Sequence, residues 1–199
     1  MPGPLGHVVN SPDVDGGTSA LCASRLPGCL TGETQGNSDI SIGDGKKIVK
    51  EAATWAGTPY KKNGAAASKG ADKGGDCSGT TYRIYAVAGF PFTYNATATF
   101  AKYAKTSGRF RIVDTATEEM QVGDLLLFAE HMAIYAAFAN GDANSKTERT
   151  NKSGKGSWSQ SNDIWTATNP KGDPYQASKM SYFGVPRVYR YQKVPRAGK

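Results

Sequence analysis

The stretch GGDCSGTTYRIY, residues 74–85, joins a polar loop to a helical pattern. The residues before it, GTPYKKNGAAASKGADKGG (57–75), are polar and glycine-rich, and loops of this length within a domain are often functional. After Cys77 the apolar positions recur at helical spacing, at Thr81, Ile84, Tyr85 and Ala88. We therefore predict a helix that begins at Cys77 and ends at Gly89.

A cysteine at the first turn of a helix has two interpretations. Unpaired N–H groups and the helix dipole favour a thiolate there, which suits a nucleophile, and the same N–H groups can hold an oxyanion. A nucleophilic thiol also needs a base, and the chain has two histidines, His7 and His131. His7 lies in an irregular segment, so elimination favours His131. The alternative is a small buried Cys77 and a structural His131.

The rest of the chain predicts an α+β fold, because helical patterns come first and strand patterns follow. We expect a first helix within residues 43–57, capped by Asp44, and a short helix from about Asn95. The polar insertion of residues 139–163 reads as a surface loop. Strands of a mostly antiparallel sheet are expected at 109–113, 123–129, 131–138, 164–168, 179–183 and 187–192. The interpretation is an irregular N-terminal arm, 1–41, followed by one domain, 42–199.

The composition limits the classes of partner. A net charge of +7 suits an anionic polymer or surface, but no long basic run indicates nucleic-acid binding. No segment reaches the length of a membrane span, and the N-terminus lacks the pattern of a cleaved secretory signal. Three cysteines and two histidines are too few and too dispersed for a structural zinc site, and no cofactor is expected. Cys22 and Cys29 are either a disulfide or two free thiols.

Four segments, in order, carry a family resemblance: GTPYKKNG (57–64), DCSG (76–79), GDLLLF (123–128) and HMAIY (131–135). They resemble the signature segments of the NlpC family, papain-like cysteine peptidases of bacterial cell walls. The resemblance implies a papain-like NlpC fold, with N-terminal helices packed on the sheet and the catalytic cysteine at a helix N-terminus. It also implies a cysteine peptidase or amidase.

The resemblance assigns roles by position. It makes Cys77 the nucleophile and His131 the general base, and the backbone N–H of Cys77 the oxyanion donor. It places Tyr60 and Asp76 in the substrate cleft, with Asp76 facing a positive group of the stem peptide and the Ser78 side chain also contacting substrate. The alternatives are that Asp76 only caps the helix and that Tyr60 anchors the loop.

The third catalytic position departs from the family, which has His, Asn or Gln there. By pattern, DIWTAT (163–168) places Thr166 at this position. A threonine hydroxyl can accept a hydrogen bond from an imidazole N–H but carries no charge. Asn140, Asn144, Asn169 or a backbone carbonyl are the alternatives.

The implied function is hydrolysis of an amide bond in a peptidoglycan stem peptide. The chain also resembles single-domain amidase effectors of the type VI secretion system. That likeness implies synthesis in the cytoplasm, export without a cleaved signal, action in the periplasm of a competitor cell, a secretion-apparatus carrier and a cognate immunity protein. The alternatives are a non-catalytic wall-binding module and a papain-like lipid acyltransferase or deacylase. Neither nucleic acid nor stable membrane insertion is expected.

Overall fold

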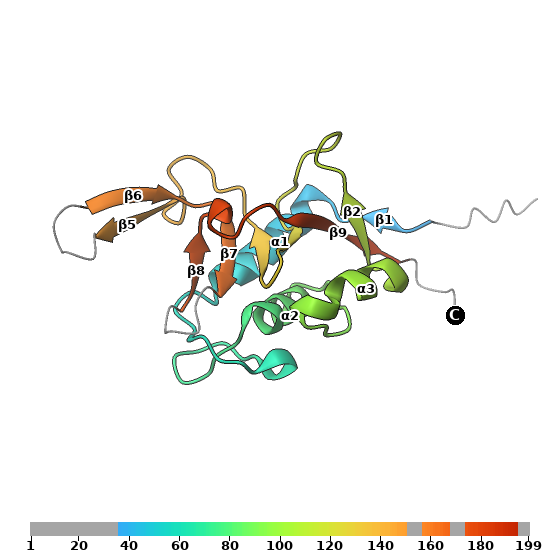
Figure 1. Cartoon of the computed structure of the whole chain (residues 1–199), viewed down its shortest axis with the longest axis horizontal. Helices are drawn as coiled ribbons and strands as arrows, with labels where there is room; N and C mark the ends of the chain where they lie inside the picture. Colours follow the sequence, from blue (N-terminus) through green and yellow to red (C-terminus); the bar gives the residue numbers. More distant parts are fainter. Residues whose placement is uncertain (1–35, 151–156, 168–173, 195–199) are drawn as a thin grey trace, which may run out of the picture. The chain divides into compact units, whose positions relative to one another are not determined.

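A computed structural model describes residues 36–150, 157–167 and 174–194 (Figure 1). Three α-helices are present in these ranges: α1 (Ile42–Ala53), α2 (Cys77–Val87) and α3 (Thr97–Ser107). Two 3₁₀ turns, η1 (Gly64–Ala66) and η2 (Met180–Tyr182), lie in connecting segments. The strands are β1 (Ser38–Asp39), β2 (Phe110–Val113), β3 (Leu125–Leu127), β4 (Met132–Tyr135), β5 (Lys146–Thr150), β6 (Ser157–Ser161), β7 (Ile164–Ala167), β8 (Tyr175–Ser178) and β9 (Arg187–Lys193).

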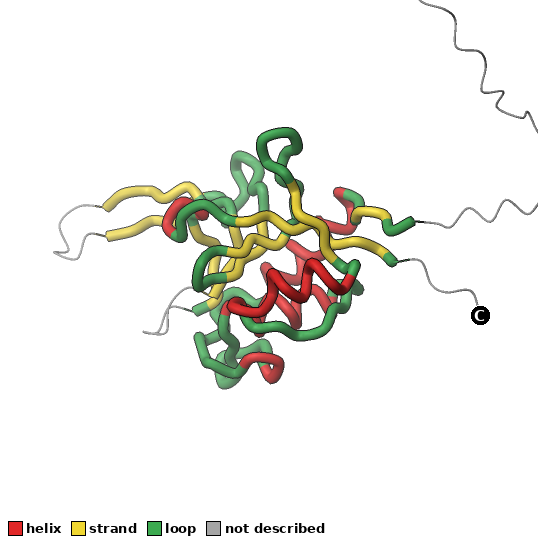
Figure 2. Tube along the Cα trace, turned by 45° about the vertical axis from the view of Figure 1, so that its right-hand side comes forward, coloured by secondary structure: helices red, strands yellow, loops and turns green. Residues whose placement is uncertain are grey.

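The main sheet is antiparallel throughout its described pairings. Its order is β1-β9-β3-β4-β7-β8, and β2 also pairs with β9. Figure 2 shows the helices gathered on one side of this sheet. The prediction of an α+β fold with a mostly antiparallel sheet is confirmed.

The start of α1 corrects one prediction. Ser41, and not Asp44, is the N-cap residue, and its hydroxyl accepts from the Asp44 N–H at 3.1 Å. The Asp44 carboxylate in turn accepts from the Ser41 N–H, which completes a capping box. An acidic residue three positions after a serine is the signal that identifies this arrangement.

Two further predictions were wrong. The polar insertion contains a separate hairpin, in which β5 pairs with β6. It was missed because its strands consist mainly of polar residues and lack the apolar alternation that reveals strands. Residues 179–183 are not a strand: η2 lies there, and β8 is at Tyr175–Ser178 instead. Residues 1–35, with Cys22 and Cys29, lie outside the described ranges, although β1 shows that Ser38 and Asp39 of the predicted arm join the sheet.

The strand alternation divides the core between the two faces of the sheet. Met132 and Ile134 of β4 pack with the helices, in a cluster that includes Cys77. Ala133 packs on the opposite side, in a cluster with Phe128. His131 directly precedes β4, so it lies where the chain enters the sheet between these two environments.

Candidate active site

The N-terminus of α2 is fixed by Asp76, its N-cap residue. The carboxylate of Asp76 accepts from the Gly79 N–H at 2.7 Å, from the Gly64 N–H at 2.9 Å and from the Ser78 hydroxyl at 3.0 Å. It therefore caps the helix and ties the preceding polar loop to it. These bonds hold the adjacent Cys77 at the first turn of α2.

Gly79 is required by the close approach of this loop. A Cβ at position 79 would lie 2.2 Å from the carbonyl oxygen of Gly64 and 3.0 Å from the Cβ of Ala67. Real Cβ atoms do not approach backbone this closely, so any side chain here would push the loop away from α2. Gly79 thus allows the loop to pack closely against α2.

The Cys77 thiol is almost fully buried, with 8% of the residue exposed. Its sulfur lies 3.6 Å from the Thr97 hydroxyl at the start of α3. Burial raises the pKa of Cys77, against the opposing effect of hydrogen bonds from Thr97 and from the backbone N–H groups of Met132 and Ser78. The resting group is therefore a neutral thiol and not the thiolate that its place at a helix N-terminus led us to expect.

His131 is covered by an aromatic ring. Phe183 stacks on the imidazole, with ring centroids 4.2 Å apart and an interplanar angle of 11°, and Phe128 lies 6.2 Å away. Burial lowers the pKa of His131 from 6.5 to about 4. The imidazole is consequently neutral near pH 7, which is the protonation state of a base.

Thr166 of β7 hydrogen-bonds this imidazole. Its hydroxyl lies 2.5 Å from His131 Nε2 and donates to the carbonyl oxygen of Met132 at 3.1 Å. The tautomer protonated on Nε2 satisfies both contacts, because the hydroxyl oxygen can then accept from Nε2–H while its own proton goes to Met132. Nδ1 is then the unprotonated nitrogen, with its lone pair available.

No direct hydrogen bond joins the two candidate catalytic side chains in the part of the chain that the structure describes. Among the described residues, the Cys77 thiol hydrogen-bonds the Thr97 hydroxyl and not the His131 ring. The backbone N–H of Met132, the next residue after His131, donates to the Cys77 sulfur. This contact places the thiol beside the start of β4. Catalytic hydrogen bonds are often incomplete before substrate binds, so this geometry is compatible with a cysteine–histidine pair.

A cleft of about 470 Å³ opens over the thiol. Tyr60 lines it, and burial raises the pKa of the Tyr60 hydroxyl, helped by the nearby Cys77 and Asp76. The Ser78 side chain also lines the cleft, but its hydroxyl is bonded to Asp76 and lies 3.3 Å from the Tyr94 hydroxyl. The full lining is Tyr60, Lys62, Asp76, Cys77, Ser78, Tyr94, Ala96, Thr97, Ala98, Ala129 and Glu130.

The described residues contain no group of three or more His, Cys, Asp and Glu side chains that could hold a metal ion. Within those same ranges, no helix has both the length and the apolar character needed to cross a bilayer.

Residues 57–171 match the model of the NlpC/P60 family. The chain belongs to the NlpC/P60 family. Members of this family are generally cell-wall hydrolases of the cysteine-peptidase type, and the matched range contains Cys77, His131 and Thr166. No curated protein matches the chain.

A solved structure is also similar to this NlpC/P60 chain. It is a protein similar to a lipoprotein of the NLP/P60 family from Staphylococcus aureus, with 17% sequence identity and a TM-score of 0.47. The similarity covers 79% of this chain and 44% of the other, so the chain matches less than half of that protein's length.

Three residues at this NlpC/P60 site were not predicted from the sequence. Thr97, the first residue of α3, approaches the thiol, and Tyr94 in the α2–α3 connection approaches Ser78. Phe183, directly after η2, stacks on His131. Tyr94 and Thr97 stand at the start of the helix predicted from about Asn95, but a helical pattern does not show which other element its start contacts. Phe183 lies 52 residues after His131 in a segment that we expected to be a strand, so its ring contact had no local signal.

Proposed function

We propose that this protein hydrolyses an amide bond in a peptidoglycan stem peptide, with Cys77 as the nucleophile and His131 as the general base. The observation that carries the proposal is the hydrogen bond between His131 Nε2 and the Thr166 hydroxyl, which suits the tautomer with Nδ1 as the basic nitrogen. The Cys77 thiol, at the first turn of α2, is the group that such a base would deprotonate. Thr166 then serves as the positioning residue at the third place of the triad.

The reaction starts from neutral partners. As a substrate carbonyl enters the cleft, His131 Nδ1 takes the thiol proton and the sulfur attacks the carbonyl carbon. The N–H of Cys77, unpaired at the first turn of α2, donates to the oxyanion. The imidazolium gives its proton to the leaving nitrogen, the C–N bond breaks, and a thioester remains. His131 then takes a proton from water, whose oxygen attacks the thioester and releases the acid and the thiol.

The cleft suits a peptide that carries both charges. Lys62, Asp76 and Glu130 line it, so a carboxylate and an ammonium group of a stem peptide would each meet an opposite charge. Asp76 would offer this interaction in addition to its capping role. The net charge of +7 would hold the anionic wall polymer near the enzyme.

The proposed biological role is that of an antibacterial effector. The enzyme would be made in the cytoplasm, delivered by a secretion-apparatus carrier and active in the periplasm of a target cell. A cognate immunity protein in the producing cell would block the cleft over Cys77.

The test is digestion of purified peptidoglycan sacculi, followed by chromatography and mass spectrometry of the released muropeptides. The unmodified protein should release new products, and Cys77→Ala should release none. Thr166→Val removes the hydroxyl at nearly constant volume and should lower kcat with little change in KM, because it disturbs the base and not the cleft. Identical chromatograms for the unmodified protein and Cys77→Ala would refute the proposal and favour a non-catalytic wall-binding module.

A further inference from the structure

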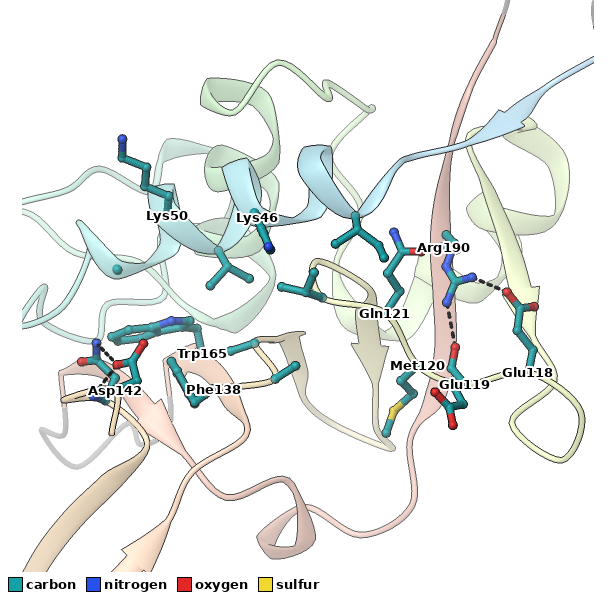
Figure 3. Close-up of a pocket in the computed structure, with 17 residues that line it drawn as sticks. Lys46, Lys50, Glu118, Glu119, Met120, Gln121, Phe138, Asp142, Trp165 and Arg190 are labelled. Carbon is teal, nitrogen blue, oxygen red and sulfur yellow. Dashed lines mark hydrogen bonds and ion pairs between the residues drawn. The ribbon is translucent and has the colours of Figure 1, made fainter. Parts of the chain in front are cut away.

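A second pocket lies apart from the Cys77 cleft. It has a volume of about 720 Å³ and is drawn in Figure 3. One wall is a face of α1, and the others come from residues 118–122, residues 136–144, Trp165 of β7 and Arg190 of β9. It shares no lining residue with the cleft. Pockets of this size accommodate small organic ligands.

Trp165 supplies an unused hydrogen-bond donor at this pocket. The residue is 2% exposed, and its Nε1 has no hydrogen-bond partner. The indole is held by Tyr175, stacked at 5.9 Å, and by Phe138, packed edge-on at 5.7 Å. A buried donor without an acceptor is unfavourable, so a ligand that brings a carbonyl oxygen to this end of the pocket would gain from it.

The walls of the pocket are mainly apolar. Val49, Ala53, Met120, Val122, Ala136 and Phe138 line it. Ala137 also lines it, and among the described residues it is the one non-glycine residue with a positive φ, at 47°. This costly conformation turns the chain immediately before Phe138, whose ring lies beside Trp165 in Figure 3.

The charges around the pocket are not equally compensated. Glu118 pairs with Arg111 and Arg190. Lys46 and Lys50 form no ion pair with any residue that the structure describes, and neither does the Glu119 carboxylate at the opposite side. These two lysines stand one turn apart on α1, and Figure 3 shows Lys46 over the middle of the pocket and Lys50 turned away from it. Asp142 lies beside Trp165 in Figure 3, so the carboxylate of a ligand is disfavoured at the Trp165 end of the pocket.

We propose that this pocket binds a small amphiphilic carboxylate. Its apolar chain would lie between Val49 and Met120, its carboxylate would meet Lys46, and a neutral carbonyl oxygen would accept from Trp165 Nε1. An N-acyl amino acid has these three groups in one molecule. The site would act independently of the hydrolase cleft and does not rest on the catalytic roles of Cys77 and His131.

The test is isothermal titration calorimetry of the full chain with N-decanoylglycine and with its neutral analogue N-decanoylglycinamide. The carboxylate should bind more tightly than the amide, and Lys46→Gln should weaken carboxylate binding about fivefold while sparing the amide. Lys47→Gln, on the same helix but outside the pocket, is the matched control and should change neither. Trp165→Phe keeps an aromatic ring and removes the donor, so it should weaken both probes.

Binding should be unchanged in Cys77→Ala, which separates this pocket from the cleft. Absence of measurable heat at millimolar probe would overturn the proposal, as would equal effects of Lys46→Gln and Lys47→Gln. Loss of binding in Cys77→Ala would assign the probe to the cleft and would also overturn it. If Trp165→Phe shows no cooperative thermal transition, the Lys46 and Lys47 variants with the two probes decide the result.

Discussion

Removal of the ring that covers His131 should raise the pKa of that histidine. Phe183 stacks on the imidazole at 4.2 Å, and the charged imidazolium is disfavoured because the ring excludes water from one of its faces. The variant Phe183→Ala opens this face. Thr166 remains and still accepts from Nε2–H, so the tautomer should be unchanged.

The expected change in pKa follows from the pKa shift that His131 already shows in the folded protein. Burial lowers the pKa of His131 from 6.5 to about 4, which corresponds to about 3 kcal/mol of preference for the neutral form. Phe183 covers one of the two ring faces, while Phe128 and Thr166 remain. We therefore expect Phe183→Ala to raise the pKa by about one unit or more, equivalent to about 1.4 kcal/mol.

The same shift links pH to stability. Because the folded pKa lies below the ordinary one, the unfolded chain binds the proton more tightly. The contribution of His131 to the free energy of unfolding is therefore complete above about pH 6.5 and is lost as the pH falls toward 4. In Phe183→Ala this loss should be smaller, and the acidic limb of the pH–rate profile should move to higher pH.

The assay is NMR titration of the imidazole protons. The chain has two histidines, so His7 gives an internal reference in the same sample, and His7→Gln assigns the two signals. Tyr182→Ala is the matched control, because Tyr182 is 55% exposed and adjacent in the chain. The reasoning fails if His131 titrates near 6.5 in the unmodified protein, or if Phe183→Ala and Tyr182→Ala shift it equally.

Two further predictions concern the helix starts and are checked by urea unfolding. Gly79→Ala should lower the free energy of unfolding by about 3 kcal/mol, because its Cβ would meet the Gly64 carbonyl at 2.2 Å. Gly43→Ala is its control: the new Cβ meets only the Ser41 hydroxyl, at 3.6 Å, so this variant should be neutral or slightly stabilising, and equal losses would contradict the packing argument. Ser41→Ala should cost about 1 kcal/mol through loss of the capping box with Asp44, and an unchanged midpoint would show that the cap adds nothing.

The sequence was informative wherever local spacing determines structure. The helix from Cys77 was found because its buried positions recur every three or four residues and Gly89 follows. The strand around Ile164 was predicted from the short segment IWTAT, and all four residues of β7 are buried. The resemblance of DIWTAT to the family's third strand position predicted Thr166, and its hydroxyl does lie within hydrogen-bond distance of His131 Nε2.

The failures share a physical cause, which is dependence on contacts distant in the sequence. The strands of the β5–β6 hairpin consist mainly of polar residues, so the backbone pairing defines them, and pairing is not visible in composition. Residues 179–183 have strand-like side chains, yet Met180 N–H is drawn to the Asp163 carboxylate at 2.5 Å and the chain turns there. Phe183 thereby reaches His131, a contact that no local pattern predicts.

Burial and the helix N-terminus act in opposite directions on Cys77. The dipole and the N–H groups of Met132 and Ser78 favour a thiolate, but a residue that is 8% exposed loses more from desolvation than these contacts return. Burial likewise disfavours the charged imidazolium form of His131. A thiolate–imidazolium pair would relieve both penalties only when the two charges meet. In the mechanism that we propose, both groups are neutral before substrate binds, and substrate entry that brings Nδ1 to the sulfur would generate the thiolate.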